Sequence, residues 1–143
     1  MSRTIYENSN DLANEETVKQ AIEKHGAVLK KMPMNYRIDY MSFRDGVPTA
    51  VIEVKSRKKG IASTTYPLFM LSLSKWHSGI DYFNKSKLNF VLAGKYDDGI
   101  FTYKYSPEDK VEIKWFGGRP DREDKDDQEP CVYVPMKLFK RIA

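Results

Sequence analysis

The chain has 143 residues, 41% hydrophobic and 13% aromatic, which fits one domain with an apolar core and excludes two full domains or wholesale disorder. The net charge is +4, but residues 121–129 hold six acids and two bases, so the rest carries +8 and suits a polyanion such as nucleic acid, or is simply a basic solvated surface. No apolar run approaches the roughly 20 residues of a membrane helix, residues 1–11 lack a secretory core, and the single Cys131 cannot form an internal disulfide, so we expect a cytoplasmic protein.

The first predicted element is a helix over residues 10–25. Asn10 or Asp11 can cap its start, and Gly26 can end it. Its apolar side chains recur at helical spacing and form one stripe, made of Leu12, Val18, Ala21 and Ile22. Residues 27–32 then favour a short strand.

Two further strands are expected at residues 36–43 and 49–56, where β-branched and aromatic residues gather. Asp45-Gly46 lies between them and is a strong turn signal. The pattern therefore predicts an antiparallel hairpin.

A second helix is predicted to open at Tyr66-Pro67 and to run to about Asn84. Its apolar residues are spaced 4, 3, 4 and 3 apart, which places them on one face that we interpret as core: Phe69, Leu73, Trp76, Ile80 and Phe83.

The last predicted elements are strands. Residues 88–93 and 100–105 flank Asp97-Asp98-Gly99, and we interpret these two aspartates as turn residues rather than metal ligands. Residues 111–116 and 131–134 are further strands, separated by an acidic loop at 118–130. The order of helix, three strands, helix and three strands indicates a single α/β (α+β) domain over residues 1–143.

The most informative segment for chemistry is the second strand of the first hairpin. Glu53 and Lys55 point to one side of it, because strand side chains alternate between faces. A solvated cross-strand ion pair is the plain alternative, since this pattern is common. Asp39, on the partner strand, favours a functional site over this plain ion pair. A two-residue turn would pair Asp39 with Ile52 on the wrong face, whereas a three-residue loop or a bulge would bring it opposite Glu53.

Glu15 is a third candidate carboxylate. At 100° per residue it lies about 50° from the centre of the apolar stripe of its helix, so it can lean over the sheet, while Glu16 should face water. A favourable position near the positive end of the helix explains Glu15 equally well. If these acids meet, they require a positive partner, and hard oxygen ligands suit Mg²⁺ or Mn²⁺.

These residues resemble the PD-(D/E)XK nuclease superfamily. The segments NEETVKQAIEKHG, YRID and AVIEVKSRKK are similar to archaeal-type Holliday junction resolvases of that superfamily. The segment TTYPLFMLSLSKWHSGIDYF is more similar to small phage-encoded nuclease-like proteins. The resemblance covers about residues 11–93 and implies a restriction-endonuclease-like αβββαβ core with a mixed central sheet, followed here by extra C-terminal strands.

By this resemblance, Glu15, Asp39, Glu53 and the Val54 carbonyl would be metal ligands, and Lys55 would be the catalytic lysine. Ile38 stands where the superfamily name has proline, a position that varies widely among its members. The helix after Lys55 often carries Gln or Lys near the site. In this chain Lys75 lies about 120° from the apolar seam, and Ser72 about 60°.

The expected activity is metal-dependent hydrolysis of DNA phosphodiesters, by an endonuclease that acts on structured or branched DNA. Cutting both strands would suggest a homodimer, since one protomer offers one site. The basic residues expected to contact DNA phosphates are Arg57, Lys58, Lys59 and Lys75. Two alternatives stay open on the same fold, a nucleic-acid-binding module that does not cut and a protein-interaction domain.

Overall fold

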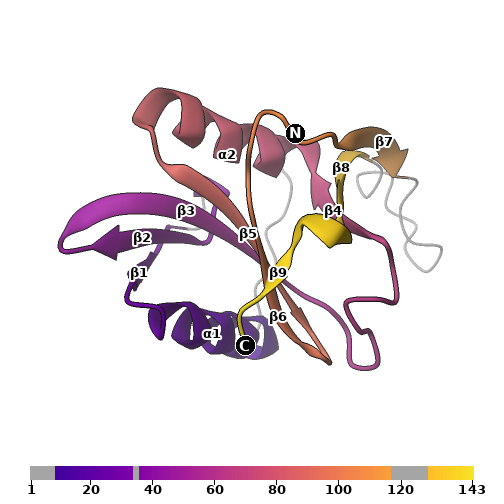
Figure 1. The fold of residues 1–143 in the computed structure, drawn as a ribbon, viewed down its shortest axis with the longest axis horizontal. Helices are drawn as coiled ribbons and strands as arrows, with labels where there is room; N and C mark the ends of the chain where they lie inside the picture. Colours follow the sequence, from indigo (N-terminus) through magenta and orange to yellow (C-terminus); the bar gives the residue numbers. More distant parts are fainter. Residues whose placement is uncertain (1–8, 34–35, 117–128) are drawn as a thin grey trace.

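Two sheets and two helices make up the fold in the computed structural model, which describes residues 9–33, 36–116 and 129–143 (Figure 1). The larger sheet has six strands in the order β1-β2-β3-β5-β6-β9, and the smaller has three in the order β4-β8-β7. Strands β3 and β5 are parallel and the other pairs are antiparallel, so the larger sheet is mixed, as expected. The elements in chain order are α1 (Ser9–Glu23), β1 (Val28–Lys31), β2 (Tyr40–Arg44), β3 (Val47–Ser56), β4 (Leu68–Ser72), α2 (Leu73–Ser86), β5 (Asn89–Tyr96), β6 (Gly99–Lys104), β7 (Glu112–Phe116), β8 (Glu129–Pro135), the 3₁₀ turn η3 (Met136–Leu138) and β9 (Lys140–Arg141).

The helices cover opposite faces of the larger sheet, as Figure 1 shows. Helix α1 packs through Val18 and Ala21 on the face that carries Ile52 and Val54. Helix α2 packs through Trp76 on the other face, together with the smaller sheet. This α+β arrangement confirms the predicted restriction-endonuclease-like class. Because β3 lies in the middle of the sheet, its even and odd residues meet different helices.

The second helix is shorter than predicted, and a strand takes its place at the start. Residues 68–72 form β4, which pairs antiparallel with β8, and α2 begins only at Leu73. Phe69 and Leu71 are fully buried, in strand-like alternation with their half-buried neighbours. The helical spacing of Phe69 and Leu73 was therefore coincidental, and pairing with a strand more than 50 residues later decides the structure.

The first hairpin forms as predicted, with a bulge. The turn at Asp45-Gly46 has two residues, and Arg44 pairs with Val47. The register then shifts by one, because Phe43 pairs with Pro48 but Ser42 pairs with Ala50, which leaves Thr49 as the extra residue. The Thr49 hydroxyl donates to the Ser42 carbonyl at 3.2 Å and so closes the bulge.

The other strands agree with the sequence apart from their ends, and β9 was not predicted because it has only two residues. Of the acidic loop expected at 118–130, only Glu129 and Pro130 are described, where they begin β8. In the described part of the chain, neither α1 nor α2 has the length and apolar character needed to cross a bilayer.

Candidate active site

The bulge places Asp39 beside the middle strand of the sheet. Tyr40 pairs with Ile52, so continuing this register by one residue sets Asp39 opposite Glu53. The Asp39 carboxylate accepts a hydrogen bond from the Val54 backbone N–H at 2.7 Å. The sequence required an odd loop or a bulge for this alignment, and the structure provides the bulge.

Glu53 is a buried acid with one oxygen left over. Its side chain is 1% exposed, and its Oε2 accepts a hydrogen bond from Lys75 Nζ at 2.8 Å. Its Oε1 is buried without a hydrogen-bond partner among the described residues. Burial raises the pKa of Glu53 to about 7 and the charge of Asp39 adds to this, although Lys75 opposes the shift.

Glu15 reaches the same region from α1. Its side chain is 12% exposed whereas Glu16 is exposed, so helical spacing gave their directions correctly. Lys31, on β1, lies between two acids, with Nζ 2.8 Å from Glu15 Oε2 and 3.5 Å from Asp39 Oδ1. Burial raises the pKa of Glu15 to about 7, with Lys31 opposing and Asp39 adding to the shift.

Lys55 follows Glu53 on the same face of β3. Burial lowers the pKa of its amine, and the positive charge of Lys75 lowers it further, while Glu53 opposes both. An amine that loses its proton more readily than a surface lysine can take part in proton transfer or stabilise charge in a closed site.

Lys75 was expected on an outer face of the helix, but it points to Glu53. The reason is the later start of α2. Ser72 caps the helix and accepts a hydrogen bond from the Lys75 backbone N–H at 3.4 Å, so Lys75 lies in the first turn, against the end of the sheet. The contact with Glu53 raises the pKa of Lys75 against the effect of burial, which keeps it charged.

The basic run after β3 is only partly turned to solvent. The Arg57 guanidinium lies 5.2 Å above the Phe69 ring, while Lys58 and Lys59 are exposed. Asp97 and Asp98 anchor the loop that follows, through the Gly60 N–H at 2.7 Å and the Ser63 N–H at 2.8 Å. The two aspartates lie in the turn between β5 and β6, as predicted, and they also hold the loop after β3, which was not predicted.

The acids at this site form two paired sets in the structure, Glu15 and Asp39 around Lys31, and Glu53 with Lys75. Within the described residues, no group of three His, Cys, Asp or Glu side chains is arranged as a metal site. The three-carboxylate site expected from the sequence therefore stays a prediction.

Comparison with known families decides the relationship. The model of the family described as "Phage putative PDDEXK endonuclease" matches residues 1–142, nearly the whole chain. The chain belongs to this phage PD-(D/E)XK endonuclease family. The match confirms the resemblance seen in the sequence and extends it past residue 93, through the C-terminal strands. A search of the curated proteins finds no match.

Sequence reasoning did not single out Lys31, which contacts Glu15 and Asp39, and it placed Lys75 about 120° from the apolar seam without foreseeing its contact with Glu53. Leu29 and Lys31 alternate with Lys30 along β1, and Leu29 is 3% exposed, so Lys31 emerges on the same side as a buried residue. That alternation was visible in the sequence. The position of Lys75 was not, because it depends on where α2 begins.

The raised pKa values predict how stability depends on pH in the metal-free protein. Glu53 titrates near 4.5 when unfolded and near 7 when folded, so between these values the folded state binds more protons. We expect the free energy of unfolding to decrease as the pH rises through this window, with Glu15 contributing in the same direction. Urea denaturation from pH 4.5 to 8, in the presence of a chelator, measures this change in the free energy of unfolding.

The Glu53→Gln variant isolates the share of Glu53 in this pH dependence. It should show a flatter dependence than the wild type, because the amide does not titrate. A variant that loses stability in parallel with the wild type across the window would contradict the assignment.

Proposed function

We propose that the protein is a divalent-metal-dependent DNA endonuclease that hydrolyses phosphodiester bonds. Membership of a phage PD-(D/E)XK endonuclease family supports the class of activity. The observation that carries the proposal for this chain is the buried Glu53 carboxylate, whose Oε1 has no hydrogen-bond partner among the described residues. It lies next to Val54, whose N–H donates to Asp39, and on the same strand face as Lys55.

The donor set fits a hard divalent cation such as Mg²⁺ or Mn²⁺. A buried carboxylate oxygen without a partner is costly unless a cation or donor satisfies it. A strong positive charge would also stabilise the ionised forms of Glu15 and Glu53, whose pKa values are raised to about 7. Glu15, Asp39, Glu53 and the Val54 carbonyl would hold the ion, which when bound polarises a phosphate oxygen and acidifies a water molecule.

The remaining residues act on the substrate. Lys55 would hold the attacking water or stabilise charge that develops on the phosphate, since a partly buried amine is more effective there than in water. Arg57, Lys58 and Lys59 extend from the end of β3 and would contact flanking phosphates. Lys75 would contact the substrate only when it leaves Glu53. A cytoplasmic location and a homodimer that cuts two strands stay predictions.

Cleavage of supercoiled plasmid tests the proposal. We expect the wild type to nick and linearise plasmid with Mg²⁺ or Mn²⁺ and to be inactive in EDTA. Lys55→Ala should lower the rate by at least about 100-fold, the scale of losing one charge-stabilising group. Lys104→Ala, which removes an exposed lysine of β6, is the matched control and should cut like the wild type. Salt-sensitive DNA binding without any cleavage would instead support the non-catalytic module.

Replacement of Lys31 is expected to strengthen metal binding. Its ammonium group bridges Glu15 and Asp39 and therefore competes with a cation for both acids. Lys31→Gln should raise the affinity for Mn²⁺, measured by calorimetry, by about three- to tenfold, the scale of one partly screened ion pair.

Lys30→Gln is the control for Lys31→Gln, because it removes an equal charge from the preceding residue of β1. Lys30 has its amine 5.2 Å from the Phe43 ring instead of against the acids. An equal gain in Mn²⁺ affinity in the two variants would show a general charge effect and contradict the competition.

A further inference from the structure

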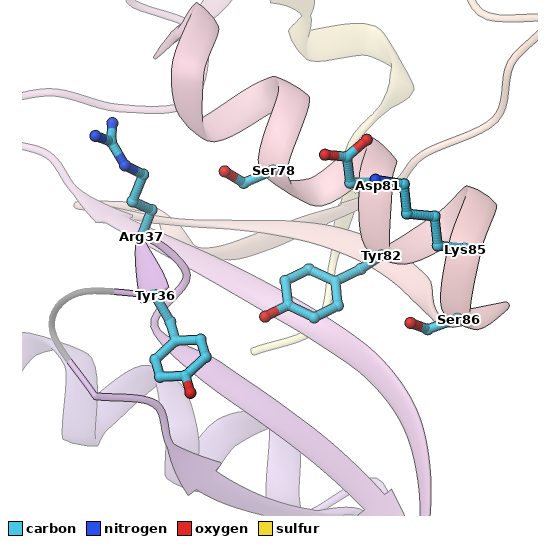
Figure 2. Close-up of a pocket in the computed structure, with 7 residues that line it drawn as sticks. All are labelled: Tyr36, Arg37, Ser78, Asp81, Tyr82, Lys85 and Ser86. Carbon is cyan, nitrogen blue, oxygen red and sulfur yellow. The ribbon is translucent and has the colours of Figure 1, made fainter.

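A groove of about 380 Å³ lies between α2 and the segment that leads into β2 (Figure 2). Neither the family match nor the proposed chemistry assigns it a role. Its lining combines two aromatic rings, two cations, one acid and two hydroxyl groups: Tyr36, Arg37, Ser78, Asp81, Tyr82, Lys85 and Ser86.

One lining residue, Arg37, links the groove to the segments that carry Asp39 and Lys75. Arg37 is two residues before Asp39, and its guanidinium donates to Ser74 Oγ at 2.7 Å. Ser74 directly precedes Lys75, whose amine holds Glu53. Arg37 also has a φ of 64°, in the left-handed region that an arginine rarely adopts, so its contact with α2 is maintained against backbone strain.

The dimensions of the groove suit a nucleic acid strand. Helix α2 runs from Lys75 at the active site to Lys85 at the far end of the groove. At 1.5 Å per residue, these ten residues span about 15 Å, which is the length of about four stacked nucleotides. A strand in the groove would thus run along α2 toward Lys75, which contacts Glu53.

The chemistry favours a single strand over a duplex. Figure 2 shows Arg37 and Lys85 on opposite sides of the groove, with the Tyr82 ring between them. Tyr36 is 51% exposed, so a large aromatic surface is available to a ligand. A duplex hides the faces of its bases, whereas unpaired bases stack on aromatic rings while cations hold the phosphates. Asp81 would accept hydrogen bonds from base amino groups.

We propose that this groove binds a single-stranded segment of the DNA substrate, next to the bond that is cut, with a base stacked on Tyr36. The inference rests on the proposed function and narrows its substrate class to DNA with an unpaired strand, such as a flap, a gap or a branch.

Fluorescence anisotropy in EDTA tests this without cleavage. The probes are a blunt duplex and the same duplex with a single-stranded tail. The wild type should bind the tailed duplex more tightly. Tyr36→Ala should weaken binding of the tailed duplex at least about fivefold, the lower end expected for losing one base stack, and leave the blunt duplex within about twofold. Trp115→Ala, which removes another exposed aromatic residue, should change neither.

A second variant tests the same groove through charge. Lys85→Gln should lower the slope of log affinity against log salt by about one for the tailed duplex only.

Equal binding of the two probes by the wild type, or equal loss of both in Tyr36→Ala, would overturn the inference. If the wild type cuts plasmid but Tyr36→Ala binds both probes normally, the groove assignment alone fails. If the tail preference depends on Tyr36 and no metal supports cutting, the groove stands and the proposed catalysis fails.

Discussion

Replacing Glu53 with glutamine should reduce plasmid cleavage by more than about 100-fold and leave the protein folded. Changes to residues that only support a metal ligand typically reduce affinity or activity 10- to 100-fold, so loss of a ligand itself should exceed that range. The fold should survive because the neutral amide replaces a buried charge, one oxygen of which has no partner among the described residues. Lys75 loses only the charge of its partner, because the amide oxygen can still accept its hydrogen bond, and its side chain is 37% exposed and can be hydrated.

Two matched variants make this result specific. Glu112→Gln removes an exposed glutamate of β7 and should keep full activity. On α1, Glu15→Gln is compared with Glu16→Gln in the same way, because the Glu15 side chain is turned inward and the Glu16 side chain is exposed. If Glu53→Gln cuts plasmid at the wild-type rate, or if Glu16→Gln loses as much activity as Glu15→Gln, the assignment of the acids is wrong.

Gly79→Ala should destabilise the protein by about 1–3 kcal/mol, even though alanine is favoured over glycine in helices by about 1 kcal/mol. A Cβ at Gly79 would come within 2.3 Å of the Phe90 ring of β5. That ring is fully buried and lies edge-on to Trp76, with centroids 5.7 Å apart, so it has little room to move. Thermal unfolding should show a decrease of several degrees.

The variant also bears on function, because α2 carries Lys75 and one wall of the groove. A helix that is pushed away from the sheet should therefore lose tailed-DNA binding as well as stability. Ser78→Ala is the neighbouring control for stability and should unfold near the wild-type temperature. Phe90→Leu in the Gly79→Ala background should recover part of the loss, as coupled neighbours do in a double-mutant cycle. Strict additivity of the two substitutions would contradict the clash.

The hairpin illustrates how far the sequence could lead. Composition and turn residues located both strands and the turn, but the two-residue turn alone would have put Asp39 on the wrong face. Only the requirement that Asp39 meet Glu53 indicated a bulge, and nothing in the local sequence marked Thr49 as its position. The bulge is fixed by contacts across the strands, such as the Thr49 hydroxyl with Ser42.

The region between β3 and α2 shows the limit of periodicity. Phe69 and Leu71 alternate over too few residues to distinguish a strand from a helix start, and the partner strand begins at Glu129. Because this error shifted the start of α2, it also misplaced Lys75. Glu15, Glu53 and Lys55 were less affected, since each lies within an element that the sequence predicted, whereas Asp39 depends on the bulge.

The bulge at Thr49 also restricts how the hairpin can be redesigned. A turn lengthened by one residue, combined with deletion of Thr49, would reproduce the alignment of Tyr40 with Ile52. A change in strand length made alone in this hairpin would move Asp39 out of register with Glu53 unless a new bulge compensates for it. Chimeras joined in the loop after Lys59 would leave the two acids aligned.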